Sequence, residues 1–131
     1  MASDDETQGN DADESVGNNG SAKQVTQDGI LHVYEVGEVI VLGFAGKDVP
    51  SNFNVAHYRE AIAELAKVND ANKIVFDLTG VRIVPSGILG LWASLNKQGI
   101  EIEAYNPSQD IREVLEITKL DQLITIKEVD V

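Results

Sequence analysis

The chain has no cysteine among its 131 residues, which excludes disulfide bonds, thiol catalysis and cysteine metal sites. Its two histidines, His32 and His57, stand in no metal-ligand or catalytic motif, so we expect neither a metal ion nor another cofactor. No apolar run approaches the roughly 18 residues that suggest a membrane span, and the N-terminus lacks the basic and apolar stretches of a signal peptide. These absences predict a soluble, cytoplasmic protein.

Positive charge is scarce, because 10 basic residues stand against 22 acidic ones and give a net charge of −12. Such a chain repels nucleic acid and anionic lipid, so neither is an expected partner. The imbalance is steepest in residues 1–28, where seven acids and one base, Lys23, give −6. This segment also has almost no sizeable apolar side chains, which predicts a disordered acidic tail that folding does not need. The folded domain is expected to span residues 29–131.

Beyond this tail, short strands are expected to alternate with helices. A helical period of apolar residues predicts helices over 54–68, over 86–98 and after Asn106-Pro107, where Asn106 is the expected N-cap and Pro107 lies in the first turn. Runs of β-branched residues predict strands over 31–34, 39–42, 73–78, 100–104 and 123–126, the first two forming a hairpin. Glu101 and Glu103 alternate with apolar residues, so one face of their strand is expected to be wetter. The order predicts one α/β domain, with helices packed on a mixed, mostly parallel sheet of about five strands.

No arrangement of residues typical of catalysis is present. The chain lacks both the phosphate loop that ends in Gly-Lys-Ser/Thr and the Gly-x-Gly-x-x-Gly turn of dinucleotide sites. The segment Gly43–Lys47 resembles a phosphate loop only in part, and no helix is expected directly after it. We therefore expect no catalytic residue and no enzyme activity.

Asp77 lies near the end of the expected central strand, where ligands gather in open α/β sheets. Its carboxylate could take part in a ligand site together with Thr79. It could equally anchor the following loop by a hydrogen bond to the turn at Thr79-Gly80. The sequence leaves both roles open.

The segment Ile74–Leu95, IVFDLTGVRIVPSGILGLWASL, resembles the central strand, loop and helix of a STAS domain. This family includes modules of sulphate transporters and bacterial anti-sigma-factor antagonists. Gly99–Tyr105 is similar to the next strand of the family, and residues 106–120 are similar to its last conserved helix. The resemblance covers residues 30–131, and no transporter segment precedes them, so we expect the free-standing antagonist type.

The resemblance implies a non-catalytic protein that takes part in partner switching. The expected partner is an anti-sigma factor or an ATPase-like serine kinase, which phosphorylates a residue at the start of the central helix and thereby breaks the complex. A phosphate would add about −1.5 to −2 charges to the docking surface. The resemblance places this surface in the loop Arg82–Ser86 and on the exposed side of the helix expected over 86–98. The residues singled out for binding are Arg82, Val84, Pro85, Ser86 and Gly87.

The phosphoacceptor motif departs from the family pattern, which runs Asp-Ser-Ser/Thr-Gly. Aligned on Ser86-Gly87, the chain has Val84 in place of the Asp and Pro85 in place of the acceptor, and proline cannot be phosphorylated. Ser86, the only hydroxyl in the loop, is then either the phosphoacceptor or only the N-cap of the helix. A small-ligand or nucleotide sensor is the alternative function, because some STAS-like domains are thought to bind such molecules.

Overall fold

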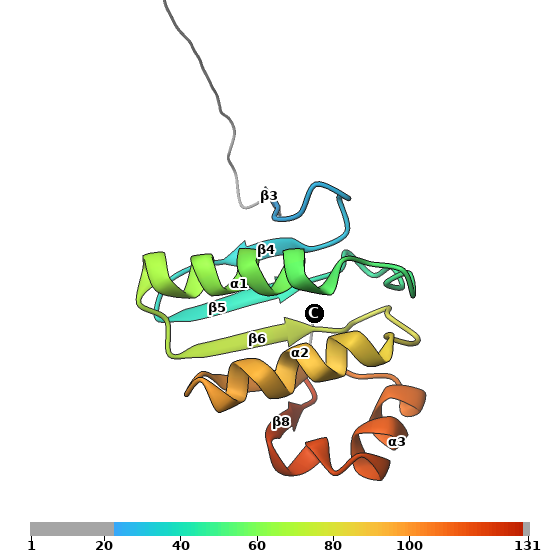
Figure 1. Ribbon diagram of the computed structural model, residues 1–131. Helices are drawn as coiled ribbons and strands as arrows, with labels where there is room; N and C mark the ends of the chain where they lie inside the picture. The colour runs from blue at the N-terminus through green and yellow to red at the C-terminus, as the bar shows by residue number, and fades with distance from the viewer. Residues whose placement is uncertain (1–22, 130–131) are drawn as a thin grey trace, which may run out of the picture.

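The computed structural model describes residues 23–129 of the chain (Figure 1). Within these residues six strands form one sheet, in the order β3-β4-β5-β6-β7-β8. The strands are β3 (Lys23–Gln24), β4 (His32–Glu35), β5 (Val39–Gly43), β6 (Lys73–Asp77), β7 (Glu101–Tyr105) and β8 (Ile124–Lys127). The helices are α1 (Val55–Asn69), α2 (Ser86–Lys97), α3 (Gln109–Ile117) and the short 3₁₀ helix η2 (Leu120–Gln122).

The sheet topology confirms the predicted fold class. Strands β4 and β5 form the expected antiparallel hairpin, whereas β5, β6, β7 and β8 run parallel to one another. Each parallel step needs a crossover, which α1, α2 and then α3 with η2 supply. The sheet has six strands rather than about five, because β3 lies inside the segment that was expected to be a tail.

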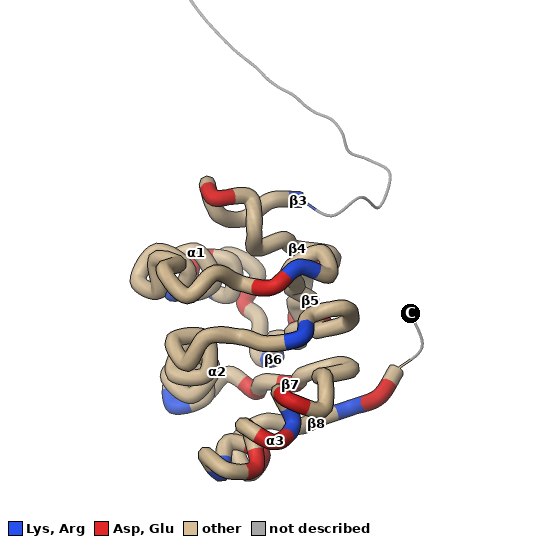
Figure 2. The backbone as a smooth tube through the Cα atoms, turned by 90° about the vertical axis from the view of Figure 1, so that its right-hand side faces the viewer, with Lys and Arg blue, Asp and Glu red and all other residues tan. Residues whose placement is uncertain are grey.

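The helices lie on one face of the sheet, so the described part of the molecule has two layers (Figure 2). The core fills the space between these layers. The parallel register sets four buried isoleucines side by side across the sheet, namely Ile40, Ile74, Ile102 and Ile124. Trp92 of α2 is fully buried, with its ring centroid 5.2 Å from that of Phe76 on β6. The apolar period read in the sequence therefore marks the side of each helix that meets the sheet.

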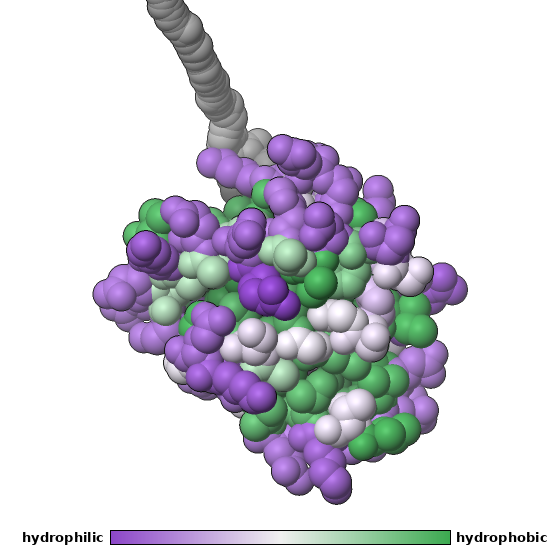
Figure 3. All heavy atoms as spheres, viewed as in Figure 1, coloured by the Kyte–Doolittle hydropathy of each residue, from purple (hydrophilic) through white to green (hydrophobic). Residues whose placement is uncertain are grey.

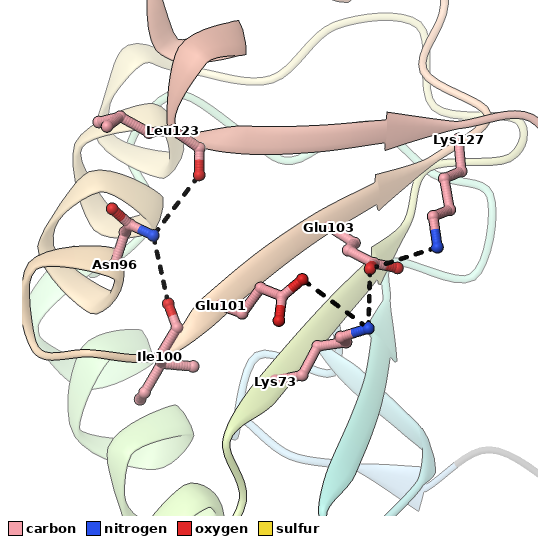
Figure 4. A network of polar contacts seen from close by, with 7 residues as sticks. All are labelled: Lys73, Asn96, Ile100, Glu101, Glu103, Leu123 and Lys127. Carbon is pink, nitrogen blue, oxygen red and sulfur yellow. Dashed lines mark hydrogen bonds and ion pairs between the residues drawn. The ribbon is translucent and has the colours of Figure 1, made fainter.

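The opposite face of the sheet carries a buried acid, Glu103, that the sequence placed on a wetter face. Glu101 is exposed as expected, but only 2% of Glu103 is exposed. The ammonium groups of Lys73 and Lys127 lie 2.9 and 3.4 Å from one carboxylate oxygen of Glu103 (Figure 4). The aliphatic stems of such lysines can cover neighbouring groups while their charged ends stay near water. Two cations thus compensate the charge that Glu103 buries.

These contacts move the pKa values of the paired groups in opposite directions. Burial by itself raises the pKa of Glu103, but the hydrogen bond from Lys73 and the charges of both lysines outweigh it and hold the pKa below its usual range. The hydrogen bond to Glu103 raises the pKa of Lys73. Both groups are therefore ionised at neutral pH.

Residues 23–28 belong to the folded structure, which differs from the boundary expected after residue 28. Strand β3 pairs with β4, and Thr26 is buried with 3% of its surface exposed. Asp28 accepts hydrogen bonds from the Tyr58 hydroxyl at 2.6 Å, from the backbone N–H of Ile30 at 3.0 Å and from the Thr26 hydroxyl. Backbone pairing and polar side-chain contacts hold this segment, and Val25 is its only apolar side chain packed against the core, so its composition did not reveal it. The rest of the predicted tail, residues 1–22, lies outside the described residues.

Candidate functional site

The candidate site lies at the carboxyl ends of the parallel strands. There the loops that follow β5, β6 and β7 lead into the N-termini of α1, α2 and α3 (Figure 1). Ligand and partner sites of open α/β sheets gather at this edge. The loop of residues 78–85, between β6 and α2, lies in the middle of the three and contains most of the predicted docking residues.

Asp77 and Thr79 are engaged with each other at the start of this loop. The carboxylate of Asp77 accepts hydrogen bonds from the backbone N–H of Thr79 at 3.0 Å and from its hydroxyl at 2.7 Å. The side-chain amide of Asn106 donates to the same hydroxyl oxygen at 3.0 Å. These contacts are those of a loop anchor. No group of three or more acids or histidines within residues 23–129 is arranged to hold a metal ion.

Asn106 ties the site to the end of the chain and does not cap α3. Its side chain exchanges two hydrogen bonds with the backbone of Val129, at 2.8 and 2.9 Å. The cap of α3 is Ser108, whose hydroxyl oxygen accepts from the backbone N–H of Ile111 at 3.1 Å. The sequence pattern predicted this helix correctly, but the predicted N-cap, Asn106, is wrong.

Arg82 is held by residues from both neighbouring loops. Its backbone N–H and its guanidinium donate to the two carboxylate oxygens of Asp48, at 2.9 and 3.0 Å. Its carbonyl oxygen accepts from the hydroxyl of Ser108 at 2.7 Å. The hydrogen bonds from Arg82 lower the pKa of Asp48. Although 85% of the Arg82 side chain is exposed, its charge is already paired, which the sequence could not show.

Ser86 is the first residue of α2, and its predicted role as N-cap is wrong. The N-cap position belongs to Pro85, which provides no side-chain hydrogen bond, and its carbonyl accepts from the backbone N–H of Ile88 at 3.0 Å. Because Ser86 lies inside the first turn, its hydroxyl is not in place to cap the helix. Ser86 is exposed at the point where α2 presents unpaired backbone N–H groups.

Gly87 provides the space in which the ring of Phe53 packs against α2. A Cβ atom at position 87 would lie 3.0 Å from the Phe53 ring, closer than ordinary van der Waals contact. Phe53 also makes an edge-to-face contact with Tyr58, at a centroid distance of 4.9 Å. Gly87 therefore has a packing role between α1 and α2. Sequence reasoning missed Phe53, because a single aromatic residue in a loop belongs to no motif.

Apolar side chains are exposed on both sides of the N-terminal end of α2. In the loop, 57% of Ile83 is exposed, and Val84 and Pro85 are partly exposed. On α3, 37% of Val114 and 80% of Ile117 are exposed. Hydrophobic residues gather over α2 and α3 on the face shown in Figure 3. Ile83 lies within the predicted docking loop Arg82–Ser86, but sequence reasoning did not single it out, although it is the one large hydrophobic residue of this loop that is exposed.

A separate pocket of about 200 Å³ lies where residues 27–28 meet the start of α1. It is lined by Gln27, Asp28, Asn54, His57 and Tyr58. Burial alone raises the pKa of Asp28, but hydrogen bonds from Thr26, Tyr58 and Ile30 reverse that effect and lower it. Asp77 and Thr79, the predicted ligand residues, take no part in this pocket.

No family model and no curated protein matches the sequence of the chain. Its structure is similar to the crystal structure of a candidate anti-sigma factor antagonist, TM1081 of Thermotoga maritima. That match has a TM-score of 0.59 at 20% identity, and it covers 74% of this chain and 85% of the other. An NMR structure of the protein TM1081 matches with a TM-score of 0.59 at 21% identity, covering 74% of this chain and 79% of the other. The chain has a STAS-like fold.

The STAS-like fold confirms the resemblance that residues 74–120 carry in the sequence. At about one identical residue in five, the structural match establishes the fold and leaves the function to be argued from the site. No helix within residues 23–129 has the length and apolar character needed to cross a membrane.

Proposed function

We propose that this protein is a non-catalytic interaction module of the anti-sigma-factor-antagonist type, which acts by partner switching. Its partner would be an anti-sigma factor or an ATPase-like serine kinase. The observation that carries the proposal is the exposed apolar loop Ile83–Pro85, which leads directly into the exposed Ser86 at the start of α2. Hydrogen bonds from Arg82 to Asp48 and from Ser108 to Arg82 hold this loop in place while its apolar side chains are exposed. Such a loop is suited to binding a protein, because little further ordering is needed when the partner docks.

Phosphorylation of Ser86 would give this surface a switch. The N-terminus of a helix favours phosphate, so the modified residue would be tolerated by the fold. Arg82, the base in the loop, is already paired with Asp48 and leaves the new charge largely uncompensated. A hydrated phosphate beside Ile83 and Val84 would then oppose the docking of an apolar partner surface.

The test is affinity purification of the tagged full-length chain from its own host, with the wild type compared with Ser86→Asp and Ser86→Ala. We expect the wild type and Ser86→Ala to retain one protein partner and Ser86→Asp to lose it. Mass spectrometry of the untreated protein should find phosphate on Ser86. Equal retention of the partner by all three proteins would exclude the Ser86 switch, and the absence of any protein partner would contradict the proposed function.

A small-ligand sensor has less support. Asp77 and Thr79, the residues named for a ligand, satisfy each other and Asn106 by hydrogen bonds. A titration with ATP and GTP, followed by the fluorescence of the buried Trp92, separates the two functions, and the partner-binding account predicts no saturable change.

A further inference from the structure

The middle of α2 contains a glycine that the isolated domain does not need. Gly90 is exposed in the helix interior, and a Cβ atom there would meet no other atom within 4 Å. Glycine at such a position is less favourable than alanine by a factor of about 2 to 5 in the folding equilibrium constant. Gly87 differs, because the ring of Phe53 occupies the space beside it. Packing within the chain therefore explains Gly87 and leaves Gly90 unexplained.

The exposed apolar residues of α3 lie on the flank that faces away from its ion pair. Arg112 of α3 binds Glu128, just beyond β8. At 100° per residue, Val114 and Ile117 lie about 160° and 140° around the helix from Arg112. The hydrogen bond from Ser108 to Arg82 joins the start of α3 to the loop that carries Ile83. Ile83, Gly90, Val114 and Ile117 thus belong to adjoining elements, over which hydrophobic residues gather in Figure 3.

The charges around this surface are mostly negative. Three acids of α3 are exposed, namely Asp110, Glu113 and Glu116. At 100° per residue, Asp110 and Glu113 lie about 20° and 40° around the helix from Ile117, whereas Glu116 lies on the side of Arg112. The two arginines nearby, Arg82 and Arg112, are each paired with an acid. Lys97 and Lys119 lie at the C-terminal ends of α2 and α3, and the exposed Lys47 directly precedes Asp48 in the loop after β5.

We propose that an apolar helix of a partner protein, bordered by lysine or arginine residues, packs on α2 at Gly90 between Ile83 and the Val114–Ile117 flank of α3. This inference rests on the proposed function and adds the chemistry of the partner. The missing side chain at Gly90 lets the partner helix approach the α2 backbone closely. Basic residues at its border face Asp110 and Glu113 and steer the encounter. A second copy of this chain would set the same acids against themselves in a two-fold interface, which favours a different protein.

The first test places the photo-crosslinker p-benzoylphenylalanine in the full chain, in its own host, at position 83, 117 or 68. Val68 of α1 is the matched control, because it is apolar and 71% exposed, as Ile83 and Ile117 are apolar and exposed, but lies on another helix. We expect positions 83 and 117 to crosslink to one and the same protein, which is not a second copy of this chain. Position 68 should not crosslink to that protein. The crosslinked peptide from position 117 should carry apolar residues at helical spacing with at least two Lys or Arg beside them.

Two kinds of failure can be told apart in this test. No protein adduct from position 83 or 117 contradicts the proposed function together with this inference. An adduct from position 83 without one from position 117 overturns this inference alone, and so does a partner peptide without basic residues. An adduct with a second copy of the chain, or with lipid, also overturns it.

The second test measures Gly90→Ala and Gly90→Leu against the partner identified by crosslinking, with Ala56→Leu on the exposed side of α1 as the control. We expect Gly90→Ala to raise the melting temperature of the free protein and to weaken partner binding at least about fivefold. Gly90→Leu should weaken binding further, and Ala56→Leu should leave it unchanged. Unchanged affinity for both Gly90 variants would overturn the close approach at this residue.

Discussion

Asp48 binds Arg82 through both the backbone N–H and the guanidinium of that residue, and so joins the loop after β5 to the loop before α2. Two carboxylate oxygens, at 2.9 and 3.0 Å, fix the position of Arg82 within the loop that we expect to bind a partner. The guanidinium and the carboxylate form an exposed ion pair at the surface. The hydrogen bond from the backbone N–H of Arg82 to Asp48, in contrast, does not depend on the arginine side chain. Variants of the two residues should therefore behave differently.

We predict that Asp48→Ala lowers the melting temperature more than Arg82→Ala does. Asp48→Ala removes the acceptor of the Arg82 backbone N–H, whereas Arg82→Ala removes only an exposed ion pair and keeps that backbone bond. Asp48→Ala should also weaken partner binding, because the loop loses its anchor. Thermal unfolding of both variants checks the order, and a larger loss in Arg82→Ala would show that the guanidinium and not the backbone bond holds the loop.

Removal of residues 1–22 should leave the melting temperature nearly unchanged, whereas removal of residues 1–28 should lower it clearly. The longer deletion removes β3, the buried Thr26 and the carboxylate that accepts from Tyr58. Tyr58→Phe in the full chain isolates one of these contacts and should lower the free energy of unfolding by about 1.5–3 kcal/mol, the usual range for a hydrogen bond to a charged group. Equal melting temperatures of the two truncated chains would contradict the structural role of residues 23–28.

The ion pairs of Glu103 should make the free energy of unfolding depend on pH. The folded pKa of Glu103 lies below its usual value, so its contribution is present above the unfolded value of about 4.3 and is lost as the pH falls through the folded pKa. Glu103→Gln should therefore be much less stable than the wild type at pH 7, and the difference should shrink as the pH falls below the unfolded pKa and through the lower folded pKa. The control is Glu101→Gln, because the side chain of Glu101 is 57% exposed and lies 3.8 Å from Lys73.

Thermal unfolding at a series of pH values measures this difference. A gap between wild type and Glu103→Gln that does not change with pH would contradict an ionised Glu103 in the folded state. Glu101→Gln should stay close to the wild type throughout, because surface ion pairs contribute little.

Trp92→Phe should lower the free energy of unfolding by less than is usual for a substitution of a fully buried tryptophan. The indole N–H of Trp92 has no hydrogen-bond partner among the described residues, and an unpaired buried donor carries a penalty of about 1–3 kcal/mol. Its removal offsets part of the packing that the smaller ring loses, so we expect a net loss of about 1 kcal/mol. Chemical denaturation followed by circular dichroism measures it, and a loss above about 3 kcal/mol would indicate that the N–H has a partner.

The sequence was sufficient for elements with a strong apolar period. Ile74, Phe76 and Ile102 lie in strands where they were expected, because each sits in a β-branched or apolar run with turn residues at its ends. It was not sufficient for β3. The neighbouring Thr26 accepts from the backbone N–H of Leu31, and Asp28 accepts from the hydroxyl of Tyr58, 30 positions away in the chain. Composition reports apolar burial and does not report such polar contacts.

The site shows the same division between local pattern and tertiary contact. The sequence predicted the start of α2 correctly at Pro85-Ser86. The structure, however, has Pro85 rather than Ser86 at the N-cap, and this difference of one residue decides whether the Ser86 hydroxyl caps the helix. The pairing of Arg82 with Asp48 joins residues 34 positions apart, and no local pattern encodes it. Ile83 is apolar in the sequence, and only the fold shows that it faces water.

The most direct test of partner binding through this loop is quantitative affinity purification of full-length Ile83→Asp from the host, beside the wild type and Val68→Asp. Both substitutions place a charge at an exposed apolar residue, but only Ile83 lies at the proposed docking surface. We expect one protein partner to be retained by the wild type and Val68→Asp and lost from Ile83→Asp, with all three proteins folded by circular dichroism. Retention of the same partner by Ile83→Asp at wild-type level would contradict docking through this loop.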